Sequence, residues 1–264
     1  MSTGFDVEVF QETLESLDGG NVRNLVVHGE VDSTSSDLRR RIDNGAPPGT
    51  VVVAGRQTAG RGRSGREWFS AETGNLYLSI CLSVSGDTQQ SVPMVPMVPL
   101  AAGIAAHEAI SRECRVDCRL KWPNDVLVSG KKLAGILTEL VALRGTDALV
   151  IVGIGINTGI EAFPEAIRDI ATSIPILKGT PANPAPIAAR FVHGVASWLS
   201  RIAAGERTRL VDAWKACAEP FGRRVRVGSV EGVTRDLAPD GRLLLTGDNG
   251  EVVSVVGGIV EPID

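Results

Sequence analysis

Cysteine and histidine are scarce in this chain, and their scarcity narrows the chemistry that we expect. Four cysteines and three histidines are spread over 264 residues. Cys114 and Cys118 are four residues apart, but no second pair and no nearby histidine complete a zinc-binding set. We therefore expect thiols that are buried or incidental, and we do not favour chemistry that relies on a histidine base.

The chain also lacks the marks of membrane, secreted and nucleic-acid-binding proteins. No apolar run reaches the length of a membrane span. The N-terminus has neither the basic start nor the apolar core of a secretory signal, so a cytoplasmic location is the default expectation. A net charge of −4, with 43% hydrophobic and 22% charged residues, is ordinary for a globular protein and argues against general nucleic-acid binding.

One segment, residues 55–69, is strongly basic against this mildly acidic background. Arginines alternate there with glycines, and no acidic residue occurs between Asp43 and Glu67. Glycine lets the backbone fold closely around a ligand, and arginine binds carboxylate and phosphate oxygens two at a time. Strand-like runs bracket the segment, so we favour an anion-binding loop that orders on binding, followed by Trp68 as a flat face for a base or ring. A plain surface loop and a disordered RNA-binding tail are the alternatives.

A second motif is formed by residues 121–135. Pro123-Asn124-Asp125 is a turn by composition, and the chain then returns through two lysines into an apolar strand. Such a hairpin brings Asp125 and Lys132 to the same end of a sheet, either as a functional pair or as a weak surface ion pair. Gly135 inside a strand indicates the close approach of a ligand or another backbone.

A third motif, Gly153 to Asn157, ends an apolar strand. It is not a dinucleotide-binding fingerprint, because the third glycine and the following helix start are missing. An asparagine at a strand end still suits an adenine edge or a metal-bound phosphate.

Apolar spacing and turn residues predict helices and strands in mixed order, and then a small all-β segment. Pro93, Pro96 and Pro99 recur every third residue; a polyproline ligand is one interpretation, and helix entry at Pro99 is the one we favour. After residue 219, short β runs separated by turns describe a small β-barrel-like domain of about 45 residues. The earlier elements expected are helices over 5–18, 100–110, 187–203 and 206–217, strands over 24–27, 50–54, 75–84, 119–122, 125–128, 133–141 and 149–156, and a loop over 177–186.

Taken together, these segments resemble biotin protein ligases, also called biotin–acetyl-CoA-carboxylase ligases. The resemblance covers about residues 24–264 in the family's order and spacing. It implies an α+β fold, with a mixed, largely antiparallel sheet and packed helices as in class II synthetases and biotin ligases, followed by a small SH3-like β-barrel. It divides the chain into an N-terminal helical extension (1–23), a catalytic domain (24–218) and an SH3-like domain (219–264). The motifs that carry it are Asp32-Ser33-Thr34, 57–68, 121–125, 132–137 and 153–157.

The resemblance implies a two-step reaction. Biotin and ATP form biotinyl-5′-AMP, with Mg²⁺ bound mainly through ATP rather than by protein side chains, and the biotinyl group then passes to a lysine of a biotin carboxyl carrier protein or domain. The acceptors are acyl-CoA or pyruvate carboxylases, and a monomer or weak homodimer is expected. At 4 Å and an effective dielectric of about 20, each pair of like charges brought together costs roughly 4 kcal/mol, so cations must offset it.

Two further expectations concern what the protein does not do. About 23 residues precede the first catalytic strand, too few for the winged helix-turn-helix of relatives that double as repressors, so we expect a monofunctional ligase that binds no DNA. A ligase for lipoate or octanoate is an alternative that the basic loop argues against. A nucleic-acid-binding module is the other alternative.

Residue by residue, the resemblance implies a site built from all three motifs. Lys132 is expected to reach the biotin carboxyl group and the α-phosphate. Asp125 is expected to orient or deprotonate the acceptor lysine, because a free lysine with a pKa near 10.4 is almost entirely protonated at neutral pH. Catalysis is assigned to Arg61, Arg63, Asp125 and Lys132. Biotin binding is assigned to Ser33, Thr34, Ser35 (an asparagine in some relatives), Gln57, Gly60, Arg61, Gly62, Arg63, Lys132 and Gly135. ATP binding is assigned to Arg63, Arg66, Trp68, Asn124, Lys132 and Asn157.

Overall fold

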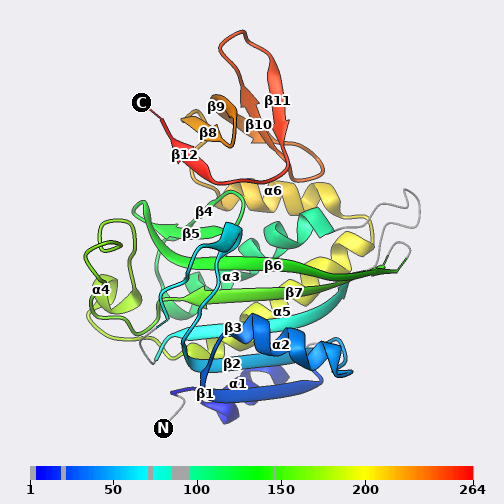
Figure 1. Cartoon of the computed structure of the whole chain (residues 1–264), viewed down its shortest axis with the longest axis vertical. Coiled ribbons are helices and arrows are strands. Elements are labelled where there is room, and N and C mark those ends of the chain that lie inside the picture. The colour runs from blue at the N-terminus through cyan, green and yellow to red at the C-terminus, as the bar shows by residue number, and fades with distance from the viewer. Residues whose placement is uncertain (1–3, 19–21, 71–73, 85–94, 145–146, 264) are drawn as a thin grey trace.

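The larger of two β-sheets organises the chain (Figure 1). The structure is a computed structural model that describes residues 4–18, 22–70, 74–84, 95–144 and 147–263. The first sheet has the strand order β1-β2-β3-β7-β6-β5-β4, in which β1 and β2 are parallel and every other neighbouring pair is antiparallel. Its strands are β1 (Asn24–Val31), β2 (Thr50–Gln57), β3 (Leu76–Val84), β4 (Arg119–Lys121), β5 (Asp125–Val128), β6 (Lys131–Arg144) and β7 (Asp147–Ile156).

Alternating side chains bury both faces of this sheet. Along β2, Val51 and Val53 point into the main core, whereas Val52 joins a smaller core with Leu38 and Cys81 on the opposite face. β-Branched residues suit such a pleated surface, and burial on both faces explains the nearly continuous apolar run at the start of β2.

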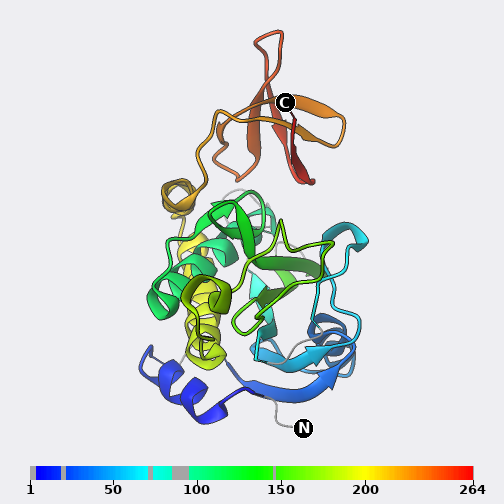
Figure 2. The same cartoon turned by 90° about the vertical axis from the view of Figure 1, so that its left-hand side faces the viewer.

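Helices cover the two faces unequally. α2 (Thr34–Asp43) packs on β2, β3 and β7 on the side of the smaller core, whereas α3 (Val98–Cys114) and α5 (Pro184–Ala203) pack together against the other face (Figure 2). Pro99 lies in the first turn of α3, as predicted, and Pro93 lies outside the described residues. No helix in the described ranges is both long and apolar enough to span a bilayer. The remaining helices are α1 (Val7–Glu15), α4 (Ile174–Lys178) and α6 (Arg207–Cys217), with short 3-10 turns η1 (Arg63–Gly65) and η2 (Val95–Met97).

A second, five-stranded antiparallel sheet follows α6 and lies beyond it in Figure 1. The indole N–H of Trp122, just after β4, donates to the carbonyl of Gly241 at 3.1 Å, and Lys215 of α6 pairs with Asp236 of the second sheet at 2.7 Å, so polar contacts join the second sheet and its loops to the rest of the chain. The α+β fold and the second antiparallel sheet expected from the resemblance are confirmed. In the order β11-β10-β9-β8-β12, the strands are β8 (Arg224–Val227), β9 (Val230–Leu237), β10 (Leu243–Thr246), β11 (Val252–Val255) and β12 (Val260–Pro262).

Two local expectations differ from the structure. The segment predicted as a loop over 177–186 contains the end of α4 and the start of α5, whose first residue is Pro184. A proline is compatible with the first turn of a helix, because the amide hydrogen that it lacks has no partner there. β12 was not expected, since Val260–Pro262 is too short to carry a periodicity.

Candidate functional site

The three motifs meet around one cavity of about 50 Å³. It lies between the first turn of α2, the basic loop after β2, and strands β6 and β7. The residues that line it are Ser33, Thr34, Ser35, Gln57, Arg61, Gly62, Arg63, Trp68, Asn124, Lys132, Gly135, Ile136, Leu137, Gly153, Ile154 and Gly155.

Short-range backbone pairing holds the basic loop over this cavity. The amide of Thr58 donates to the carbonyl of Val31 at 2.9 Å, and the amide of Trp68 donates to the carbonyl of Gly60 at 3.0 Å. Gly60 is packed against Ser70 and the Trp68 carbonyl so closely that a β-carbon would collide with both. The loop therefore returns on itself and is tied to the end of β1.

The three cations of the cavity have different partners. The Arg61 guanidinium forms a two-pronged ion pair with Glu139 on β6, at 2.7 and 3.2 Å. Arg63 instead donates to neutral acceptors, the side-chain oxygen of Asn124 at 3.0 Å and the carbonyl of Gly258 at 3.5 Å. Burial lowers the pKa of Arg63, although the nearby Asp125 opposes this shift. An arginine stays protonated even so, which leaves a half-buried positive charge available to an anion.

Lys132 completes the set of cations. Its ammonium lies 2.7 Å from a carboxylate oxygen of Asp125 and 5.2 Å from the centre of the Trp68 ring. β5 and β6 pair antiparallel, so the predicted hairpin and its Asp125–Lys132 contact are confirmed. With side-chain exposures of 33% and 24%, neither partner is fully solvated, and Lys132 lines the cavity.

Two glycines make room for the indole of Trp68. Gly135 and Gly155 stand opposite each other on β6 and β7. A β-carbon on Gly135 would lie 2.8 Å from the Trp68 ring and 2.9 Å from Lys132, and one on Gly155 would collide with the same ring. The predicted close approach at Gly135 is confirmed. The indole nitrogen is buried there without a hydrogen-bond partner among the described residues, so a ligand that offers an acceptor would satisfy it.

Not every residue assigned from the sequence lines the cavity. Arg66 is exposed on the basic loop. Asn157 is buried, and its amide donates to the carbonyl of Thr172 at 2.9 Å. Asp125 reaches the cavity through Lys132, and Gly60 lies in the base of the loop. The nucleotide roles of Arg66 and Asn157 stay predictions.

Several residues around the site escaped sequence reasoning. Glu139 sits in a strand whose register decides what it faces, Gly155 lies in the third motif but was given no role, and Ser79 is a fully buried serine in the middle of β3. The segment after Asn157 returns beside Lys132, whose amide donates to the carbonyl of Ile170 at 2.8 Å. Of these residues, only Ser79 could have been recognised from the sequence, because it is a polar residue within a mostly apolar strand.

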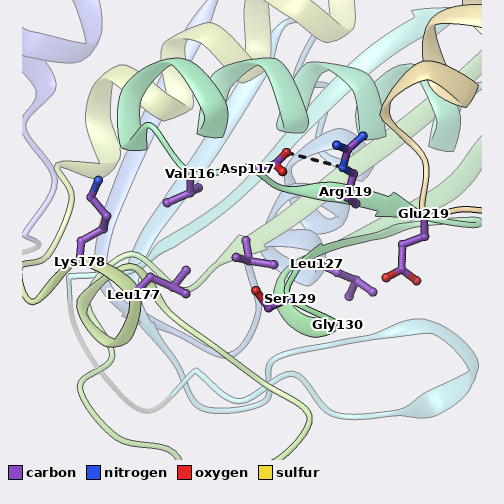
Figure 3. A pocket seen from close by; sticks show the side chains of 10 residues that line it. Val116, Asp117, Arg119, Leu127, Ser129, Gly130, Leu177, Lys178 and Glu219 are labelled. Carbon is purple, nitrogen blue, oxygen red and sulfur yellow. Dashed lines mark ion pairs between the residues drawn. The ribbon is translucent and has the colours of Figure 1, made fainter.

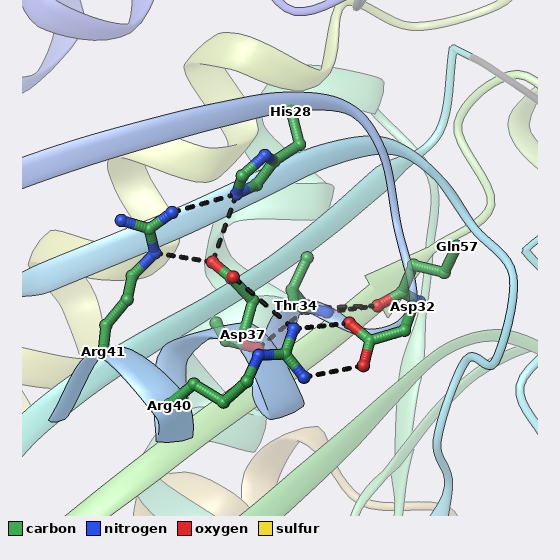
Figure 4. A network of polar contacts seen from close by, with 8 residues as sticks. His28, Asp32, Thr34, Asp37, Arg40, Arg41 and Gln57 are labelled. Atoms are coloured by element: carbon green, nitrogen blue, oxygen red, sulfur yellow. Dashed lines mark hydrogen bonds and ion pairs between the residues drawn. The ribbon is translucent and has the colours of Figure 1, made fainter. Parts of the chain in front are cut away.

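A charged network supports the turn between β1 and α2 from outside the cavity (Figure 4). Arg40 donates to both carboxylate oxygens of Asp32 at 2.8 Å each, and these hydrogen bonds lower the pKa of Asp32 to about 2. Burial alone would raise the pKa of Asp37, but hydrogen bonds from Arg41 and His28 outweigh it and lower the pKa. The network therefore restrains Asp32, the residue that precedes Ser33.

We expect this network to make stability depend on pH in the acidic range. Because the pKa of Asp32 is lower in the folded than in the unfolded chain, its contribution is complete above about pH 4 and is lost as the pH falls toward about 2. Arg40→Gln should reduce the loss of unfolding free energy between pH 5 and pH 3, and the difference should be small because both side chains are about half exposed. Urea unfolding at both pH values measures the difference. Arg39→Gln, on the same helix, is the control, and an equal slope in all three proteins would contradict the prediction.

A larger hollow of about 440 Å³ lies at the other end of the β5–β6 hairpin (Figure 3). It is lined by apolar residues and by charges of both signs, among them Asp117 and Arg119, which pair with each other at 3.6 Å. It contains none of the residues assigned from the sequence. The smaller cavity is therefore the candidate active site, because cations and buried polar groups converge on it. The larger volume of the other hollow is not by itself evidence of a reactive site.

Glu139 should hold the basic loop closed through Arg61. In Glu139→Gln the guanidinium loses its charged partner, and for a partly exposed pair we expect a change of about 0.5–1 kcal/mol, or a two- to fivefold effect. Trypsin should then cut within the basic loop two to five times faster. Glu30→Gln, which releases Arg56 at the start of the loop, is the matched control. Equal cleavage rates in wild type and Glu139→Gln would disprove the role.

A largely antiparallel sheet with a glycine-rich, arginine-bearing loop over buried polar groups suits a ligase that activates carboxylic acids, and the comparisons identify the family. The model of the Biotin/lipoate A/B protein ligase family matches residues 29–157. The Biotin--[acetyl-CoA-carboxylase] ligase of Mycobacterium tuberculosis is 33% identical over 92% of this chain and 90% of its own length. The chain belongs to the biotin protein ligase family, as the sequence motifs predicted.

Two further matches extend the comparison. The Bifunctional ligase/repressor BirA of Bacillus subtilis is 39% identical over 58% of this chain, and the match spans only 46% of that protein. Among solved structures, the biotin protein ligase of Aquifex aeolicus in complex with biotin and ATP superposes with a TM-score of 0.76 at 29% identity. That match covers 90% of this chain and 98% of the Aquifex chain.

Proposed function

We propose that this protein is an ATP-dependent ligase that forms biotinyl-5′-AMP and transfers biotin to a lysine of a biotin carboxyl carrier protein or domain. The observation that carries the proposal is that Arg61, Arg63 and Lys132 line one cavity with the polar first turn of α2. Family membership and the Aquifex aeolicus structure with biotin and ATP support it.

In the first step, a biotin carboxylate oxygen bonds to the α-phosphorus of ATP, and the bond from that phosphorus to the bridging oxygen breaks to release pyrophosphate. Two anions must approach, at a cost of roughly 4 kcal/mol for each close pair at an effective dielectric of about 20. Lys132 offsets the negative charge of the approaching oxygens. Arg63, whose hydrogen-bond partners in this structure are neutral, stabilises the charge on the phosphate oxygens. Trp68, tied to the loop backbone, covers the nucleotide and shields the mixed anhydride from water.

In the second step, the acceptor lysine must lose a proton and attack the acyl carbon, with AMP leaving. Asp125 is the carboxylate beside the reacting groups, at 2.7 Å from the ammonium of Lys132. It orients the incoming ammonium and accepts its proton once Lys132 has turned to the adenylate. Because a carboxylate also stabilises the charged ammonium, Asp125 acts mainly by orienting the acceptor lysine and by taking its proton as the new C–N bond forms.

The proposal also includes the metal ion, the roles of the domains, the cellular compartment and the oligomeric state. Mg²⁺ enters with ATP and is held mainly by phosphate oxygens, as is usual for this ion. Residues 24–218 form the catalytic domain, with 1–23 as a helical extension, and residues 219–264 close on it through the contact of Arg63 with Gly258. The free cysteines suit a cytoplasmic enzyme. A monomer or weak homodimer stays our expectation.

Incubation of the protein with ATP, Mg²⁺, biotin and a carrier domain tests the proposal directly. We expect one biotin on one lysine of the carrier, detected by mass spectrometry, and pyrophosphate release that depends on biotin. Calorimetric titration with biotin and with lipoate separates the two branches of the matched family. Tight binding of lipoate with no response to biotin would replace the proposed activity by lipoate ligation.

A further inference from the structure

A chain of buried hydroxyl groups runs from the cavity into the sheet. Thr34 and Ser35 line the cavity, and both hydroxyls contact Ser79 of β3, at 2.8 and 3.0 Å. Ser79 has no exposed surface, and Thr34 and Ser35 are each 4% exposed. Gly153 backs the chain, since a β-carbon there would lie 2.8 Å from the Ser35 hydroxyl and 3.3 Å from that of Ser79. The contacts with Ser79 are therefore tightly enclosed by protein atoms.

Gln57 lies next to these hydroxyl groups, and its partners fix the orientation of its side-chain amide. The backbone amide of Thr34 donates to the side-chain oxygen of Gln57 at 2.8 Å (Figure 4). The Gln57 amide nitrogen donates to Ser70 at 3.0 Å, and Ser70 donates to the carbonyl of Trp68 at 2.9 Å. These partners allow only one orientation of the Gln57 amide, with its oxygen toward Thr34.

The orientation of the Gln57 amide favours one assignment of the hydroxyl protons. The Gln57 oxygen only accepts, so the Thr34 hydroxyl, 3.2 Å away, donates to it. With its one proton used, Thr34 must accept from Ser79, and Ser79 in turn must accept from Ser35. Thr34 and Ser35 then offer only lone pairs to the cavity.

We infer that Ser79 is a positioning residue that makes the polar end of the cavity an acceptor site, selective for a ring that carries N–H donors. This inference rests on the proposed function and deepens it, because the cyclic urea of biotin has two N–H groups, whereas the ring of lipoate and the chain of octanoate have none. A site with buried acceptors rejects a ligand without matching donors far more strongly than an apolar pocket does. Ser79 touches no substrate and acts through Ser35 and Thr34.

The test compares biotin with the two cyclic carbamates in which one ring N–H is replaced by oxygen. Wild type should bind at least one carbamate about 100-fold more weakly than biotin in calorimetric titration. In Ser79→Ala the Ser35 proton is released and can turn to the ligand. The affinity for biotin should then fall about tenfold. The ratio of the dissociation constants of that carbamate and of biotin should shrink from about 100 to about ten. The KM for ATP should not change.

Two further variants make the result decisive. Ser79→Cys keeps the shape of the side chain, but its sulfur accepts from Ser35 only weakly, so the ratio of dissociation constants should lie between those of wild type and Ser79→Ala. Ser83→Ala, an exposed serine on the same face of β3, is the matched control and should behave as wild type. A wild-type ratio in Ser79→Ala or in folded Ser79→Cys would overturn the inference while leaving the ligase activity intact. A wild type that binds no biotin would instead overturn the proposed function, and the inference with it.

Discussion

Lys132→Ala should abolish formation of the adenylate. The ammonium of Lys132 contacts Asp125 and lies over the Trp68 ring, where the proposed mechanism brings the carboxylate and the phosphate together. Without it, at least one repulsive pair of about 4 kcal/mol is unopposed, so biotin-dependent pyrophosphate release should fall by about 10³-fold.

The neighbouring lysine provides the control. Lys131 is exposed and donates to the carbonyl of Arg168 at 3.2 Å, away from the cavity. Lys131→Ala should keep wild-type rates, and circular dichroism should show both variants folded. A Lys132→Ala protein that releases pyrophosphate at the wild-type rate would remove Lys132 from the mechanism.

Arg63→Ala should have the second-largest effect. Arg63 is half-buried and has only neutral hydrogen-bond partners, so its charge is available to phosphate oxygens as they gain charge during transfer. Loss of one such donor from a desolvated site usually costs 10²–10³-fold in rate, and we expect this loss in single-turnover adenylate formation. Arg63→Lys should recover only part of the rate, because an ammonium lacks the rigid planar fork with which a guanidinium holds two oxygens side by side.

The control for this prediction lies at the start of the same segment. Arg56 pairs with Glu30 outside the cavity, and Arg56→Ala should react at the wild-type rate. Arg66→Ala provides a second comparison, since Arg66 is exposed although the sequence assigns it to phosphate binding. If Arg63→Ala and Arg56→Ala react equally fast, the basic loop contributes through its net charge alone and Arg63 has no specific role.

Much of the fold and of the candidate site could be predicted from patterns of neighbouring residues in the sequence. The basic loop between two strands, the hairpin that joins Asp125 to Lys132 and the helix entry at Pro99 each depend on residues close together in the chain. Turn chemistry and β-branched runs act over a few residues, so they can be recognised without knowing the rest of the fold. The motif resemblance added the order of these pieces, and the comparisons confirm the family.

The sequence by itself determined a mildly acidic α+β protein with one basic loop, one Asp–Lys hairpin and a small β segment at its end. Only the tertiary structure decided which polar groups meet: Glu139 pairs with Arg61 at a sequence separation of 78, Gly258 accepts from Arg63 at a separation of 195, and Ser79 joins Thr34 to Ser35. Such contacts depend on strand register, where a shift of one residue turns every side chain to the opposite face. Local periodicity contains no information about that register, because pairing is set by the whole core that the strands bury together.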